Sequence, residues 1–168
     1  MTIEFFKRLG WFFVYLLAQV VVLGNIHLFG VATPLVYVYF ILQLPYGYPK
    51  WGSLLWGFLL GLSVDIFFNT PGVAAASLTI IAALQPYYYQ MFVSRDSLEN
   101  LVPGLRTIGM VKFSYYVIPM VLIYCALFFT LEQFSFFHLF HWLQCVVGSA
   151  LMTLVLIYTL EIAKKRNP

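Results

Sequence analysis

Six apolar runs follow one another along the chain, and short polar or turn-forming stretches separate them. A run of about 20 apolar residues is long enough to cross a membrane as a helix. The pattern therefore predicts one all-α integral membrane domain over residues 1–168. Its six transmembrane helices are expected at approximately 9–23, 28–44, 51–68, 73–92, 113–131 and 139–163.

Prolines and one polar segment modify this simple pattern. The second run, 28–44, is close to the lower length limit of a membrane span and carries Pro34 near its start. The fourth run contains Pro86, which is expected to kink its helix because proline lacks a backbone N–H. In the polar segment 94–111, leucines and an isoleucine recur at helical spacing. We expect a short helix there that lies in the membrane interface and is interrupted at Pro103.

Composition favours a membrane protein. Of the 168 residues, 62% are hydrophobic and only 9% are charged, whereas the surface of a soluble domain needs roughly a quarter of its residues charged. The net charge of +3 comes from basic residues scattered between the apolar runs, so it does not indicate nucleic-acid binding. Lys7 and Arg8 precede the first run as in a signal peptide. No clear small-x-small cleavage site follows, and we expect a retained anchor.

The basic residues predict an orientation in the membrane. With six crossings, all nine lysines and arginines fall on one side: Lys7, Arg8, Lys50, Arg95, Arg106, Lys112, Lys164, Lys165 and Arg166. Loss of any one helix would divide this set between the two sides. Because positively charged loops stay in the cytoplasm, we expect both termini to be cytoplasmic. The turns at 24–30, 69–72 and 132–137 are then expected on the outer side.

The third run carries the most informative polar position, Asp65. Ser53, Gly57, Gly61 and Asp65 recur every fourth residue, so they form one stripe along a helix. The three small residues allow another backbone to come close, and lipid would reject the carboxylate. We therefore expect this stripe to face protein, either within the chain or in a partner.

Two uses of the stripe stay open at this point. Gly57 and Gly61 match the Gly-x-x-x-Gly close-packing motif, and the small residues 74–77 are its natural mate within the chain, while contact with another protein is the alternative use. Asp65 either binds a partner or ligand, or caps the fourth helix, or forms an interhelical hydrogen bond. Proton transport is disfavoured because no second acid lies at mid-depth.

Other polar residues lie in or beside the runs. Asn25 and His27 are expected on the outer side, where they are candidates for contact with a ligand. Hydrogen bonds between helices are expected from five uncharged side chains, namely Gln19, Asn25, Gln43, Gln85 and Gln144.

Nothing in the sequence indicates catalysis. There is no nucleophile with a base, no phosphate-binding loop and no pair of carboxylates. His138 and His141 are read as interfacial polar residues, since the spacing of a metal site is lacking. Cys125 and Cys145 are expected to be buried free thiols. We therefore expect no enzyme activity, no metal and no other cofactor.

The third run and the turn after it resemble the MreD family, the rod-shape-determining membrane proteins of bacteria. That family has a Gly-x-x-x-Gly-Leu-x-x-Asp stretch, a short turn and then a Gly that begins the next helix. The corresponding residues here are Gly57, Gly61, Leu62, Asp65 and Gly72. Upstream, the resemblance includes Gln19, Asn25 and Pro34. It is best over residues 19–72, and Leu35 stands where many members carry an acid.

This resemblance implies a multi-pass protein of the bacterial cytoplasmic membrane that works in cell-wall elongation without being an enzyme. Its implied partner is the transmembrane helix of MreC, docked on a groove that includes the third helix. MreB, RodA and the elongation-specific penicillin-binding protein work alongside it. The family is also similar in fold to the substrate-binding subunits of energy-coupling-factor vitamin transporters. A transporter subunit that binds a small molecule near Asp65, Asn25 and His27 is therefore the alternative.

Overall fold

The computed structural model of the protein describes residues 2–23, 33–45, 47–92, 102–133 and 139–166. Helices dominate these residues, and no strand occurs among them. The elements are α1 (Thr2–Leu17), the π-helix η1 (Ala18–Leu23), α2 (Val38–Leu42), α3 (Lys50–Phe68), α4 (Val73–Tyr89), α5 (Met110–Gln133) and α6 (Leu139–Arg166).

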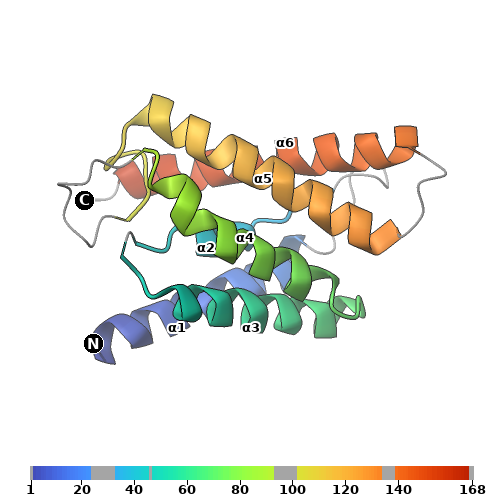
Figure 1. Ribbon diagram of the computed structural model, residues 1–168, viewed down its shortest axis with the longest axis horizontal. Coiled ribbons are helices and arrows are strands. Elements are labelled where there is room, and N and C mark those ends of the chain that lie inside the picture. The colour runs from blue at the N-terminus through green and yellow to red at the C-terminus, as the bar shows by residue number, and fades with distance from the viewer. Residues whose placement is uncertain (1, 24–32, 46, 93–101, 134–138, 167–168) are drawn as a thin grey trace.

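The long helices lie roughly along one direction (Figure 1). α5 and α6 run beside each other along one side of the molecule, and α1 and α3 run along the other side. α4 crosses between the two pairs and packs against both α3 and α5, while the short α2 lies inside. The start of α1 and the end of α6 lie at the same end of this bundle.

Length and composition identify candidate membrane-spanning helices. Among the described residues, three helices are long and apolar enough to cross a membrane: Lys50–Phe68, Met110–Gln133 and Phe140–Lys164. Their outward faces carry large exposed apolar side chains such as Ile66, Leu122 and Val155. An apolar surface of this extent is expected in contact with lipid, not with water.

The last four predicted helices are confirmed, with small shifts at their ends. α3 and α6 begin within a residue of the predicted positions, and α5 extends a few residues further in each direction. α4 ends at Tyr89 and a turn follows. α1 begins at Thr2, earlier than residue 9, and its last turns widen into η1.

The predicted second helix over 28–44 is wrong in the residues that the structure describes. Residues 33–35 have no regular secondary structure, residues 36 and 37 form a turn, and only Val38–Leu42 is helical. Pro34 disfavours a helical conformation for the residue before it and provides no N–H of its own. The backbone of this stretch is bonded by side chains of other helices, as described below.

The predicted interface helix over 94–111 is also not seen in its described part. Residues 102–109 contain a turn at 105–108 and no helix, and α5 begins directly after them. Leu105 and Ile108 pack against the hydrophobic core and do not lie out in the membrane interface. The remainder of that prediction, including Arg95 and Leu98, lies outside the described residues.

Candidate functional site

Asp65 links α3 to α4. Its side chain is only 4% exposed, and its carboxylate accepts three hydrogen bonds. One oxygen accepts from the Thr70 hydroxyl at 2.8 Å and from the Ala74 N–H at 2.9 Å, and the other accepts from the Ala75 N–H at 2.9 Å. Gly72, the residue that precedes α4, has no side chain to cap it. Asp65 therefore supplies the cap and places a negative charge at the positive end of the α4 dipole.

The glycine stripe brings the two helices into close contact. A Cβ added at Gly61 would lie 2.4 Å from the Ala75 Cα and 2.6 Å from the Ala74 carbonyl oxygen. A Cβ at Gly57 would lie 3.1 Å from the Ala82 Cβ. The intramolecular use of the stripe, with its mate at 74–77, is thus confirmed for Gly61. Since α4 occupies this face of α3, no partner helix can pack there.

Ser53 occupies the first position of the stripe and is buried. Its hydroxyl donates to the carbonyl oxygen of Lys50 within the same helix at 2.9 Å. Ser53 is therefore a small residue within the helix packing, and its hydroxyl is hydrogen-bonded within its own helix.

A second polar feature lies at the centre of the molecule, in residues 33–44, which we call the central segment. From Leu35 to Leu42 every side chain is at most 4% exposed. Gln19 of η1 bonds this backbone twice: its amide donates to the Pro34 carbonyl oxygen at 2.9 Å, and its oxygen accepts from the Val36 N–H at 3.2 Å. A non-helical backbone at membrane depth needs such internal partners, because lipid offers none.

α6 bonds the same stretch from the opposite side. The Ser149 hydroxyl oxygen accepts from the Thr33 N–H at 3.0 Å, and the Thr153 hydroxyl oxygen accepts from the Leu35 N–H at 3.0 Å. Ser149 and Thr153 are one turn apart on α6, so they lie on the same face of that helix. This face therefore bonds two backbone N–H groups that are two residues apart in the extended chain. Thr153 also donates to the Ser149 carbonyl oxygen at 2.7 Å.

Other helices hold the end of the central segment. Tyr116 of α5 donates to the Leu42 carbonyl oxygen at 3.1 Å, and the Gln85 amide of α4 donates to the Leu44 carbonyl oxygen at 3.3 Å. The Tyr124 hydroxyl donates to that of Tyr37. Gln19 and Gln85 thus bond across segments, but their partners are backbone groups outside the helices and not other helices as expected. The Gln43 side-chain oxygen accepts from the Tyr15 hydroxyl of α1 at 3.5 Å. Gln144, by contrast, is exposed on α6.

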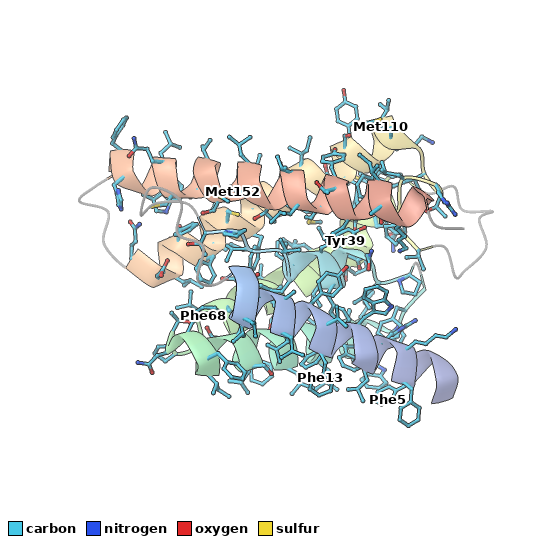
Figure 2. The ribbon with its side chains drawn as sticks, turned by 180° about the vertical axis from the view of Figure 1, so that it is seen from behind. Phe5, Phe13, Tyr39, Phe68, Met110 and Met152 are labelled. Carbon is cyan, nitrogen blue, oxygen red and sulfur yellow. The ribbon has the colours of Figure 1, made fainter. Side chains whose placement is uncertain are left out.

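Glu161 is a buried acid that the sequence analysis missed. Its side chain is only 4% exposed although it lies near the end of α6. It accepts a hydrogen bond from the Tyr39 hydroxyl of α2 and one from the Leu105 N–H at 3.0 Å, and the Lys164 ammonium lies 4.0 Å away. Figure 2 shows Tyr39 between α6 and α1. One carboxylate thus joins α2, the 102–109 turns and α6. Its position within the predicted sixth helix was the available signal.

Two cavities flank the central segment, one at the end of the bundle where α1 begins and α6 ends, here called the basic end, and one at the opposite, far end. The far-end cavity, of about 490 Å³, is lined by Thr33 and Tyr37 of this segment and by Gln19, Glu132 and His141. The basic-end cavity, of about 360 Å³, is lined by Gln43 and Leu44 of the same segment and by three cations, Lys7, Arg8 and Lys164. The buried residues between them separate the two cavities.

The structure describes some of the remaining predicted residues and not others. Asn25, His27 and His138 lie outside the described residues. Cys125 and Cys145 are buried free thiols, as predicted, and Cys145 contacts His141 at 3.7 Å. Over the described ranges, no group of three or more His, Cys, Asp or Glu side chains is placed to hold a metal ion.

We found no match to this chain among protein-family models, curated proteins or solved structures.

Proposed function

We propose that this protein has the role of an MreD-like protein in the bacterial cytoplasmic membrane. It would serve cell-wall elongation as a non-enzymatic component that binds the transmembrane helix of MreC and helps to organise peptidoglycan synthesis. The observation that carries this proposal is the α3–α4 hairpin, in which Gly61, Asp65 and Gly72 of the family resemblance act together.

Three residues of that resemblance have a physical task in the hairpin. Gly61 allows the backbones of α3 and α4 to meet, and Asp65 caps α4 through the Ala74 and Ala75 N–H groups. Gly72 precedes α4 with a φ of +82°, a conformation that glycine adopts without strain. A motif whose members depend on one another in space is stronger support for a shared fold than a chance string of small residues.

The partner helix is proposed to bind the outward face of α3, because α4 occupies the small-residue face. Four exposed apolar side chains form a stripe along this outward face: Leu55, Phe58, Leu62 and Ile66. Their spacing of three and four residues is that of one helix face, which suits a single transmembrane helix lying alongside. Contacts with MreB, RodA and the elongation-specific penicillin-binding protein would follow from assembly with MreC.

We further propose that both termini are cytoplasmic. In the described residues, the cations Lys7, Lys50, Lys112 and Lys164 lie on helix segments at one end of the bundle, the end where α1, α3 and α5 begin and α6 ends (Figure 1). Positively charged residues stay on the cytoplasmic side. This is the basic end of the bundle, where the basic-end cavity lies.

Affinity purification of the tagged protein from its native membrane in mild detergent tests the partnership. Recovery of MreC with the wall-synthesis enzymes is the expected result. A photo-crosslinking residue at Leu62 on α3 should then form an adduct with MreC, whereas the same residue at Leu151 on the outward face of α6 should not. Adducts only at Leu151 would contradict the proposed face and leave the partnership intact. Absence of MreC from the purified material would contradict the proposal itself.

The far-end cavity favours a second candidate, a substrate-binding subunit of an energy-coupling-factor type transporter. Its volume of about 490 Å³ falls in the range that holds small molecules. Its polar groups come from Gln19, Thr33, Thr70, Glu132 and His141. A thermal-shift screen with a panel of vitamins discriminates the two candidates. Stabilisation by one vitamin, together with paired ATPases in the affinity purification, would favour the transporter.

A further inference from the structure

Five parts of the chain converge on the far-end cavity. Its walls come from η1, the central segment, the end of α3 with the turn after it, the end of α5 and the start of α6. The central segment contributes Thr33, Leu35 and Tyr37, which all precede α2. Non-helical backbone in a membrane domain is typical of places where the chain lines a cavity or a binding site.

Tyr37 brings a buried hydrogen-bond donor to this cavity. Its side chain is fully buried, and its hydroxyl oxygen accepts the hydrogen bond that Tyr124 donates. A phenol carries one hydrogen of its own, and within the described residues the Tyr37 hydroxyl donates to no acceptor. A buried donor without a partner costs about 1–3 kcal/mol. An acceptor atom placed in the cavity would recover this free energy.

Two further side chains of the cavity keep hydrogen-bonding capacity. The Gln133 amide nitrogen lies 4.0 Å from the Cys145 sulfur, which is a weak acceptor. In the part of the chain that the structure describes, no group donates to the Gln133 side-chain oxygen. The Thr70 hydroxyl donates to Asp65, and its oxygen keeps lone pairs for a donor. The cavity therefore offers both donors and acceptors to a ligand.

The rest of the lining is largely aromatic and carries little charge. Phe68, Phe128 and Phe129 line the cavity, and the ring centres of Phe128 and Phe129 are 5.5 Å apart in an edge-to-face arrangement. Among the described lining residues there is no lysine or arginine, and Glu132 is the single acid. An anionic ligand is therefore disfavoured, because a buried charge needs an opposite partner. Glu132 already takes part in another interaction, so we assign it no contact with the ligand.

We propose that the far-end cavity binds an uncharged heteroaromatic molecule. Its ring lies against the three phenylalanine rings, which suits aromatic stacking. A carbonyl oxygen or ring nitrogen of the ligand accepts from the Tyr37 hydroxyl, and a ligand N–H donates to Gln133 or Thr70. This inference rests on the cavity of the second candidate function and names its ligand class. Binding of this kind does not require transport, so a protein that works with MreC would retain the site.

Saturation-transfer NMR of the full chain in mild-detergent micelles tests the ligand class, with empty micelles as the background. Three probes share one ring: nicotinamide is uncharged, nicotinate carries a carboxylate, and 1-methylnicotinamide carries a positive charge. We expect nicotinamide to bind at least about fivefold more tightly than either charged analogue, because burial penalises an unpaired charge. Tighter binding of nicotinate would reveal an anion site, and tighter binding of 1-methylnicotinamide a cation site. Either order would overturn the ligand class, and absence of nicotinamide binding would overturn the site.

The two hydroxyls of the tyrosine pair provide a matched control. Tyr37→Phe and Tyr124→Phe each remove one oxygen and the same hydrogen bond, so a purely structural effect should be alike in both variants. Tyr124 is not among the described residues that line the cavity. We expect Tyr37→Phe to weaken nicotinamide binding by about tenfold, the effect of one lost hydrogen bond, and Tyr124→Phe by less than about twofold. Equal losses in the two variants would contradict the assigned contact.

Failure of this inference is distinguishable from failure of the proposed functions. Nicotinamide binding that depends on Tyr37, without paired ATPases in the affinity purification, would support the site and contradict the transporter. Paired ATPases together with a preference for a charged analogue would support the transporter and contradict the ligand class. The recovery of MreC is measured separately and does not depend on either result.

Discussion

At the scale of single residues, Asp65 determines how α4 begins. The N–H groups of Ala74 and Ala75 lie in a buried turn, and the Asp65 carboxylate is the acceptor for both. Substitution Asp65→Ala removes this acceptor and leaves buried donors without a partner. We expect it to lower the free energy of unfolding by about 3 kcal/mol. Thermal unfolding in detergent, followed by tryptophan fluorescence, measures the change.

Two milder variants at this cap serve as controls. Asp65→Asn keeps one carbonyl oxygen as an acceptor, and Thr70→Val removes one donor while the carboxylate stays bonded to the helix. We expect a loss of about 1–2 kcal/mol for Asp65→Asn and of about 1 kcal/mol for Thr70→Val. An Asp65→Ala protein as stable as the unaltered chain would show that the cap is unimportant, and would return Asp65 to consideration as a ligand-binding acid.

A separate prediction concerns Gly61, where the backbones of α3 and α4 come closest to each other among the stripe glycines. A methyl group there meets the Ala75 backbone at 2.4 Å, so one helix must move. We expect Gly61→Ala to destabilise the protein by about 2–3 kcal/mol and Gly57→Ala, with its looser contact, by about 1 kcal/mol. Gly10 has no heavy atom within 4 Å of an added Cβ, so Gly10→Ala should raise stability by up to about 1 kcal/mol through helix propensity. Thermal unfolding of the three variants gives the order, and a Gly61→Ala protein as stable as Gly10→Ala would contradict it.

At the scale of elements, the central segment depends on side chains from its neighbours. Gln19 satisfies the Pro34 carbonyl and the Val36 N–H, both buried. Gln19→Leu preserves the approximate volume but leaves two backbone groups without a partner, and we expect a loss of about 2–4 kcal/mol. Gln144→Leu, at an exposed position on α6, should change stability by less than about 0.5 kcal/mol. Equal effects of the two substitutions in thermal unfolding would show that the Gln19 bonds contribute little.

The central segment also shows where sequence pattern is insufficient. A short apolar run reads the same whether it forms a buried helix or a buried extended chain, because no polar positions mark its faces. Pro34 was the local sign that a helix would fail there. The groups that make the extended chain possible, Ser149 and Thr153, lie more than a hundred residues away. Hydropathy alone does not associate such distant polar side chains with this backbone.

A second prediction at the scale of elements concerns residues 102–109, which a hydrogen bond to Glu161 ties to α6. The Leu105 N–H donates to its carboxylate, so Glu161→Ala removes the bond that ties these turns to α6. Amide hydrogen exchange at Leu105 and Thr107 should then become at least about tenfold faster, the effect of a loss near 1.4 kcal/mol. Thr159 bonds its own helix at Val155, and Thr159→Val should leave the exchange unchanged. Unchanged exchange in Glu161→Ala would show that packing of Leu105 alone holds the turns.

At the scale of the whole molecule, the sequence predicted the helical class and the last four helices from apolar length. It also included, among its alternatives, the cap at Asp65 and the packing of Gly61 within the chain. It did not predict which alternative holds, because the Gly-x-x-x-Gly spacing is the same in a contact within the chain and between chains. The position of α4 decides the matter, and only three-dimensional contacts give it. The cavity at Lys7 and Lys164 was likewise beyond a pattern argument, since its cations come from opposite ends of the chain.

The course of the chain bears on the predicted number of membrane crossings. Gln19 and Thr33 line the far-end cavity, whereas Leu44 and Pro45 line the basic-end cavity. The central segment therefore returns the chain from one end of the bundle to the other, as the second helix was expected to do. An extended residue advances about 3.3 Å and a helical residue about 1.5 Å, so a partly extended segment covers the distance with fewer residues. We therefore still expect six crossings.

Cysteine labelling in intact cells tests this topology. In a chain whose native Cys125 and Cys145 are replaced by alanine, the exposed positions Met91 and Met110 report the basic end, and Pro71 reports the turn between α3 and α4. A membrane-impermeant maleimide should label Pro71→Cys in intact cells whose outer barriers have been removed. It should label Met91→Cys and Met110→Cys only after the membrane is permeabilised. Labelling of Met110→Cys from outside would reverse the orientation, and labelling of all three positions from the same side would rule out α3 and α4 as successive crossings. A reversed orientation would also move Lys7 and Lys164 away from the expected cytoplasmic surface.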